Sequence, residues 1–244
     1  MKKLSANFVR ISTISALASL ALAPAALLAG PAAADPVTVN FKCQAKPPIG
    51  APQESTMTMQ VTGTAPASAP PGSAVAIKLV PGQGQIPSDQ GGYKINYVRD
   101  LTLTAPFPAN STFVSASLSG GTVRATIDTG SGKAVIKVTD RLPGGSTFTL
   151  PTIGVNVKAG NSGSITTTLS GTSYTDPGLT MVVNAQAGPF PVNVPVSCYP
   201  SPAPIFTTTV IKPGITKQEP QPAEPSAPGE FTLLPDLGLQ GSHG

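Results

Sequence analysis

The chain has 244 residues, of which 11% are charged and 5% aromatic, and its formal net charge is +4. Three of the fifteen basic residues, Lys2, Lys3 and Arg10, stand at the start of the chain, and the remainder holds twelve basic against eleven acidic residues. A chain so close to neutral lacks the basic excess that binds a phosphate backbone. We therefore expect no nucleic-acid partner.

The first 34 residues have the order of a secretory signal peptide. A basic start, MKKLSANFVR, precedes the apolar run ISTISALASLALAPAALLAG and the small residues Ala32-Ala33-Ala34. This order predicts export with cleavage after Ala34. The alternative is an uncleaved membrane anchor, which Pro24 and the small-residue ending disfavour. We expect a secreted or cell-envelope protein without a membrane span after cleavage.

Residues 35–212 alternate between apolar and polar side chains almost throughout. Alternation with a period of two is typical of half-buried β-strands. The apolar faces are Val37, Val39 and Phe41; Met57, Met59 and Val61; Val75, Ile77 and Leu79; Val123, Ala125 and Ile127; Ala134, Ile136 and Val138; Ile153, Val155 and Val157; and Ile165, Thr167 and Leu169.

The breaks between these runs are rich in Gly, Pro, Asp and Ser, as in APPGS, TGSGK and TDPGL. Such residues set or free the backbone angles of turns. With strands recurring about every ten residues, the sequence predicts an antiparallel, immunoglobulin-like β-sandwich of roughly nine to eleven strands.

The chain contains two cysteines, Cys43 and Cys198. Each continues an apolar face, Cys43 after Val37, Val39 and Phe41, and Cys198 after Phe190, Val192, Val194 and Val196. Two inward cysteines in an exported protein predict a disulfide that closes the domain. The alternative is a pair of buried free thiols.

The direction of the two cysteine strands can also be predicted. Cys43 and Cys198 both lie at the C-terminal ends of their runs, so antiparallel neighbours in simple register would hold them apart. We therefore expect the strands to run parallel or to face each other across the sandwich. Pro191 and Pro195 lack N–H groups, which places the last strand at an edge.

The sequence offers no recognisable catalytic site. Its one histidine, His243, lies in the tail, so the domain can build neither a Ser-His-Asp arrangement nor a histidine-ligated metal site. We expect no catalytic, cofactor-binding or metal-binding residues and no cofactor. A carboxylate-based hydrolase stays open as an alternative, with its candidates near predicted strand ends: Asp89, Asp100, Asp128, Asp140 and Asp176.

Four stretches resemble a group of secreted actinobacterial proteins: ADPVTVNFKCQAKPPIG, NSTFVSASLSGG, GTSYTDPGL and VPVSCYPSPAPIFTTTVI. The resemblance covers roughly residues 35–212 and its motifs are short and not catalytic. Some members are labelled dehydratase or cyclase, but no acid–base pair supports that activity here. What the resemblance implies is a secreted or envelope location.

Residues 213–244 form a Pro- and Glu-rich tail, which the composition predicts to be disordered. Its apolar end could be a docking peptide. For the domain we expect a non-enzymatic binding or scaffolding role, through loops or an edge strand, toward an envelope component or an extracellular protein. The alternative is a carrier of an apolar ligand, such as an envelope lipid, which would need a large cavity between the sheets.

Overall fold

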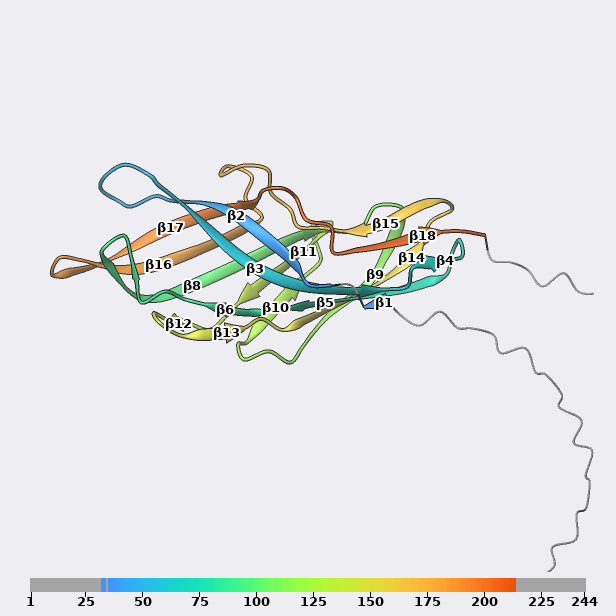
Figure 1. Ribbon diagram of the computed structural model, residues 1–244, viewed down its shortest axis with the longest axis horizontal. Helices are drawn as coiled ribbons and strands as arrows, with labels where there is room; N and C mark the ends of the chain where they lie inside the picture. The colour runs from blue at the N-terminus through green and yellow to red at the C-terminus, as the bar shows by residue number, and fades with distance from the viewer. Residues whose placement is uncertain (1–31, 34, 214–244) are drawn as a thin grey trace, which may run out of the picture.

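The computed structural model describes residues 32–33 and 35–213, which form an elongated, all-β molecule (Figure 1). The signal peptide and the tail predicted for residues 1–34 and 213–244 lie outside this range, except for residues 32, 33 and 213. Within the described range no helix is long and apolar enough to cross a membrane.

Ten strands form the main path of one antiparallel sheet, in the order β10-β11-β8-β16-β17-β2-β3-β5-β14-β9. Their bounds are β2 Val37–Ala45, β3 Gln53–Ala65, β5 Ala74–Pro81, β8 Tyr93–Pro106, β9 Ser111–Ser119, β10 Ala125–Asp128, β11 Lys133–Val138, β14 Thr152–Ala159, β16 Leu179–Ala187 and β17 Phe190–Pro200.

Eight shorter strands complete the fold. Three join the main sheet, where β1 pairs with β3, and β7 and β12 pair with β8; the others form the small sheets β13-β6 and β15-β18-β4. Their bounds are β1 Ala32–Ala33, β4 Ser68–Ala69, β6 Gln83–Gln85, β7 Asp89–Gln90, β12 Leu142–Pro143, β13 Thr147–Thr149, β15 Gly163–Thr167 and β18 Thr207–Ile211.

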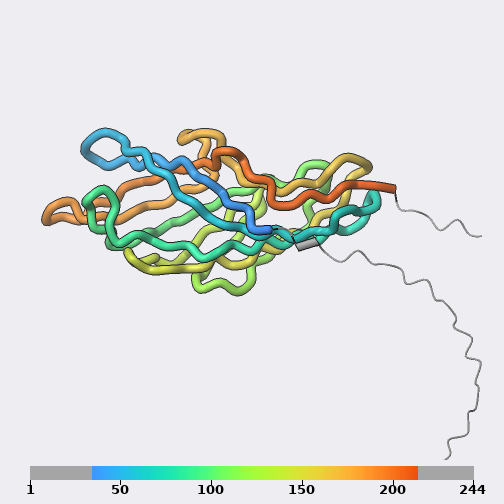
Figure 2. The backbone as a smooth tube through the Cα atoms, viewed as in Figure 1, coloured from blue at the N-terminus to red at the C-terminus, as the bar shows by residue number. Residues whose placement is uncertain are grey.

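The two longest strands, β3 and β8, each pair with one neighbour along one part of their length and with the other neighbour along another part. Strand β3 pairs with β2 over residues 53–61 and with β5 over residues 61–64. Strand β8 likewise pairs with β16 over residues 95–103 and with β11 over residues 102–106. Because each strand changes partner along its length, the sheet bends, and its end strands β9 and β10 lie against each other. The backbone trace in Figure 2 shows the resulting two layers.

The core consists of the side chains that the alternation placed inward. Val75, Ile77 and Leu79 are buried, while Ala74, Ala76 and Lys78 are exposed. The same holds for the inward residues of β2, β11 and β14. The predicted all-β, antiparallel sandwich with one disulfide is therefore confirmed. Its immunoglobulin-like character stays a prediction, because the ten strands follow one continuous path.

The small sheet β15-β18-β4 crosses the main sheet near the end of β3. A Cβ atom on Gly63 would lie 2.3 Å from the carbonyl oxygen of Phe206, just before β18. Only glycine allows so close an approach of two backbones. This crossing lies toward the right of Figure 1, where the described chain ends after β18.

The predicted disulfide is present between Cys43 and Cys198, with Cα atoms 4.1 Å apart. Both cysteines are buried, at 3% and 0% exposure. The predicted strand direction was wrong: β2 and β17 are antiparallel neighbours, and the two cysteines are register partners. They meet because only the C-terminal halves of the two strands overlap, over residues 41–45 and 196–200.

The predicted edge position of the last strand was correct for only half of β17. Residues 196–198 pair with both β2 and β16, residues 199 and 200 pair with β2 alone, and residues 190–195 pair with β16 alone. Strand β18 follows β17 in the chain, so β17 is not the last strand.

Candidate functional site

The five aspartates considered as catalytic candidates each have a local structural role. The carboxylates of Asp89 and Asp128 accept hydrogen bonds from the backbone N–H groups of Gly92 and Gly130 in tight turns. Asp176 accepts one from the hydroxyl of Thr172 at 2.9 Å within its own loop. These contacts are those of turn residues.

The other two aspartates form ion pairs. Asp100 contacts Arg99 and lies 4.0 Å from Lys137. The carboxylate of Asp140 accepts hydrogen bonds from the backbone and the side chain of Arg124, and these lower the pKa of Asp140. In the described part of the chain, no three His, Cys, Asp or Glu side chains gather as metal ligands.

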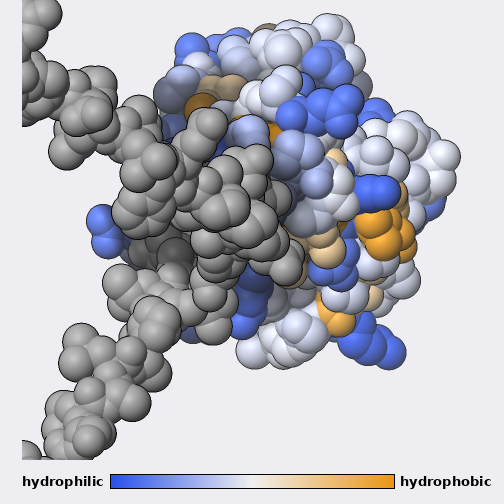
Figure 3. Space-filling model, turned by 90° about the vertical axis from the view of Figure 1, so that its right-hand side faces the viewer, coloured by the Kyte–Doolittle hydropathy of each residue, from blue (hydrophilic) through white to orange (hydrophobic). Residues whose placement is uncertain are grey.

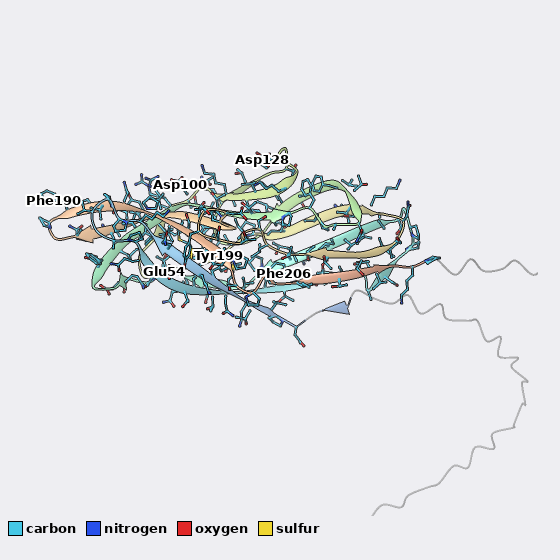
Figure 4. The ribbon with its side chains drawn as sticks, turned by 90° about the horizontal axis from the view of Figure 1, so that it is seen from above. Glu54, Asp100, Asp128, Phe190, Tyr199 and Phe206 are labelled. Atoms are coloured by element: carbon cyan, nitrogen blue, oxygen red, sulfur yellow. A yellow bond between two sulfur atoms is a disulfide. The ribbon has the colours of Figure 1, made fainter. Side chains whose placement is uncertain are left out.

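An aromatic pair covers the outer surface near the disulfide. The rings of Tyr174 and Tyr199 meet edge to face at 5.2 Å. Desolvation of the Tyr174 phenol raises its pKa, and the negative charge of Glu54 on β3 raises it further. Figure 4 shows Glu54 and Tyr199 on the same part of the molecule. We interpret this contact as the anchor of the loop that precedes β16.

The buried apolar side chains of the described residues form one hydrophobic core. Two depressions, of about 190 Å³ and about 360 Å³, are open to the surface. The first lies between residues 63–67 and 205–208, and the second along residues 118–125. A pocket for a drug-sized ligand has a volume of about 300–1,000 Å³ and buries most of the surface of its ligand. These depressions do not provide such an enclosure.

Three hairpins that each have one exposed apolar side chain lie at the same end of the molecule, at the left of Figures 1 and 2. They are the β2–β3 hairpin with Ile49 in its loop, the β7–β8 hairpin with Tyr93, and the β16–β17 hairpin with Phe190. These side chains are 92%, 51% and 71% exposed. We call this surface the hairpin end.

The register of the sheet brings the three hairpins together. Strands β8, β16, β17, β2 and β3 are consecutive neighbours, and each neighbouring pair is antiparallel. The hairpins close at the pairs Gln90–Tyr93, Ala187–Phe190 and Ala45–Gln53. The turns of adjacent antiparallel hairpins therefore lie at the same edge of the sheet.

A ladder of asparagines fixes the strands behind the hairpin tips. The Asn96 amide donates to Asn184 Oδ1, and the Asn184 amide donates to Asn193 Oδ1, both at 2.9 Å. Asn184 is 7% exposed and thus a buried polar residue with both neighbours bonded. Such a ladder aligns β8, β16 and β17 and gives the hairpin end a rigid base.

The free half of β17 is protected against pairing with another strand. The carbonyl of Pro195 accepts a hydrogen bond from the Lys46 N–H at 2.9 Å, so the polar backbone groups of residue 195 face the β2 side. By alternation, those of residue 191 face the same side. Because Pro191 and Pro195 have no N–H, this edge lacks two donors for strand addition. This edge is therefore poorly suited to the addition of another strand.

Elsewhere, large exposed apolar side chains stand singly, such as Val114 on β9 at 62% and Ile205 before β18 at 60%. Figure 3 shows the opposite end of the molecule, where hydrophobic residues form separate spots among hydrophilic ones. The hairpin end thus differs from the rest of the described surface by having three such side chains on neighbouring loops.

The sequence pattern did not indicate this surface. Phe190 was assigned to the buried face that leads to Cys198, and that assignment was wrong for Phe190, which lies at the hairpin tip beyond the core. Ile49 and Tyr93 lie in or beside turns, outside the alternating runs. Their only signal is a large apolar residue within a Pro- or Gly-rich turn, as in KPPIGAP, QGGYK and AGPFP. Comparison with protein-family models and with curated proteins found no match.

Proposed function

We propose that this protein is a non-enzymatic binding module of the cell envelope or the extracellular space, which engages its partner through the hairpin end. The observation that supports the proposal is the grouping of Ile49, Tyr93 and Phe190 on three adjacent hairpins. Exposed apolar side chains that cluster on a rigid scaffold are typical of interaction sites.

The carrier alternative has less support, because a carrier needs an enclosed apolar cavity and the two depressions of the described residues are open to the surface. The hydrolase alternative needs two carboxylates that share a site. The candidate aspartates are instead engaged in turns and ion pairs. Neither alternative is favoured by a specific contact.

The proposal can be tested by fractionating the cells that produce the protein. Replacement of both Ile49 and Phe190 by serine should release the protein from the envelope fraction into the medium, because it removes the two most exposed tips. The matched control is the double variant Val114→Ser and Ile205→Ser, which removes two side chains of similar exposure elsewhere. Equal fractionation of both variants and the wild type would contradict the proposal.

A further inference from the structure

We propose that the partner of the hairpin end is a lipid membrane surface, into which Ile49, Tyr93 and Phe190 insert. This inference rests on the proposed function and specifies its partner. The first argument is shape: the three side chains stand on separate loop tips, and the two surface depressions described above lie elsewhere on the molecule. A protein partner would need a separate pocket for each tip, whereas a fluid bilayer adapts to all three.

The second argument concerns the backbone of the loops. Burying an unpaired N–H group in an apolar medium is costly. The β2–β3 loop, KPPIGAP, contains three prolines, and the AGPFP turn contains two, so these segments have few donors. Neither segment contains an acidic residue. The loops that hold Ile49 and Phe190 therefore leave fewer unpaired N–H groups in an apolar layer than loops without proline would, although their carbonyl groups still have to be desolvated.

The third argument concerns charge at the rim. Lys46 and Lys94 flank the tips that hold Ile49 and Tyr93, and long lysine side chains can reach lipid headgroups. The two acidic residues of this end are Asp89 and Glu54. Asp89 accepts a hydrogen bond from the Gly92 N–H, and Glu54 faces Tyr174. These contacts hold the two carboxylates against the protein without removing their charge, so the end has no net charge, and the longer lysine side chains can reach outward to the headgroups.

The fourth argument concerns depth. Asn96 and Asn193 follow Tyr93 and Phe190 by three positions, which is about 10 Å along a strand. Apolar faces of interfacial amphipathic helices enter the headgroup boundary by roughly 5–10 Å, and we take the same depth for these tips. Tyr93 and Phe190 therefore reach the acyl boundary while the asparagine ladder stays at the polar level, and Ile49, in a hairpin that closes opposite Val196, enters less deeply. Tyr93 has an apolar ring and a polar hydroxyl, which suits this interface.

The experiment uses the whole domain and vesicles of phosphatidylcholine with phosphatidylglycerol. The wild type should sediment with these vesicles, and Phe190→Ser should weaken binding on the order of tenfold, as expected for loss of one inserted aromatic side chain. The control Val114→Ser should bind as the wild type does. Circular dichroism of each variant confirms that it is folded.

Insertion itself can be measured because the protein has no tryptophan. In the variant Phe190→Trp, the indole emission should shift to the blue on addition of vesicles and be quenched by brominated acyl chains. In Val114→Trp the emission should stay unchanged. Failure of the folded wild type to bind vesicles, or of the Phe190→Trp emission to shift, overturns the lipid proposal.

The two proposals fail in distinguishable ways. One outcome is that the double variant at Ile49 and Phe190 is released from the cell envelope while the wild type does not bind vesicles. In that case the hairpin end binds a protein or a glycan, and only the lipid inference is rejected. If the double variant also fractionates as the wild type does, both proposals fall.

Discussion

At the scale of single residues, Asp140 shows how the fold lowers the pKa of a surface carboxylate. Its oxygens accept hydrogen bonds from the backbone N–H of Arg124 at 2.7 Å and from the Arg124 side chain at 2.8 Å. The backbone bond is the main cause of the lowered pKa, followed by the side-chain bond. Arg124 immediately precedes β10 and Asp140 follows β11, so the contact holds together the open end of the β10–β11 hairpin.

This shift gives a pH dependence of stability with a defined sign. Because the folded pKa of Asp140 lies below the ordinary value of 3.8, its contribution is present above that value and is lost as the pH falls through the folded pKa. Asp140→Asn should therefore lower the unfolding midpoint in urea slightly at neutral pH. The difference from the wild type should vanish at strongly acidic pH. Since the pair is exposed, a large loss at neutral pH would contradict this account.

At the scale of elements, the alternating pattern predicted which side of each strand is buried, because burial depends on the nearest residues in sequence. It could not predict that β17 and β2 pair over only half of their lengths. That register depends on where the β2–β3 and β16–β17 hairpins turn. The residues of a turn indicate its position in the sequence, but they do not indicate how far the hairpin extends past the core. For the same reason Phe190 was predicted to be buried. It is the first residue of β17, and this end of the strand extends past the hydrophobic core.

The crossing of β3 and β18 gives a prediction at this scale. Gly63→Ala would place its Cβ atom 2.3 Å from the Phe206 carbonyl oxygen, so one backbone has to move. We predict a loss of about 1–3 kcal/mol in the free energy of unfolding, the usual cost of overpacking. Chemical denaturation measures this loss. Gly130→Ala is the control, since its Cβ would meet only Asp128 Oδ1, at 3.4 Å. Equal stability of both variants would show that the two sheets can separate without cost.

At the scale of the whole molecule, the Cys43–Cys198 bond joins β2 to a strand 155 positions away in sequence. The expected export and the phase of the two strands were sufficient to predict the pairing from the sequence, because the chain has only these two cysteines. The surface that we propose to be functional was not predictable in this way. It arises from three turns that are distant in sequence and meet only because β8, β16, β17 and β2 are neighbours in the sheet.

The last prediction connects this bond to the hairpin end. Without the disulfide, β2 and β17 are joined only by their backbone ladder. This ladder has five residue pairs, from Val196–Ala45 to Pro200–Phe41. Replacement of both cysteines by alanine should lower the free energy of unfolding by about 2–5 kcal/mol, because the unfolded chain regains its loop entropy. Urea denaturation measures this loss against the oxidised wild type.

The hairpin tips lie beyond the disulfide, on strands that the asparagine ladder also aligns. Vesicle binding by the cysteine variant, measured below its unfolding midpoint, should therefore match that of the wild type. Binding that declines only with the folded fraction would agree with a purely structural bond. A variant that stays fully folded but no longer binds would show that the bond holds the β2–β3 and β16–β17 hairpins in their binding arrangement, so that Cys43 and Cys198 are positioning residues.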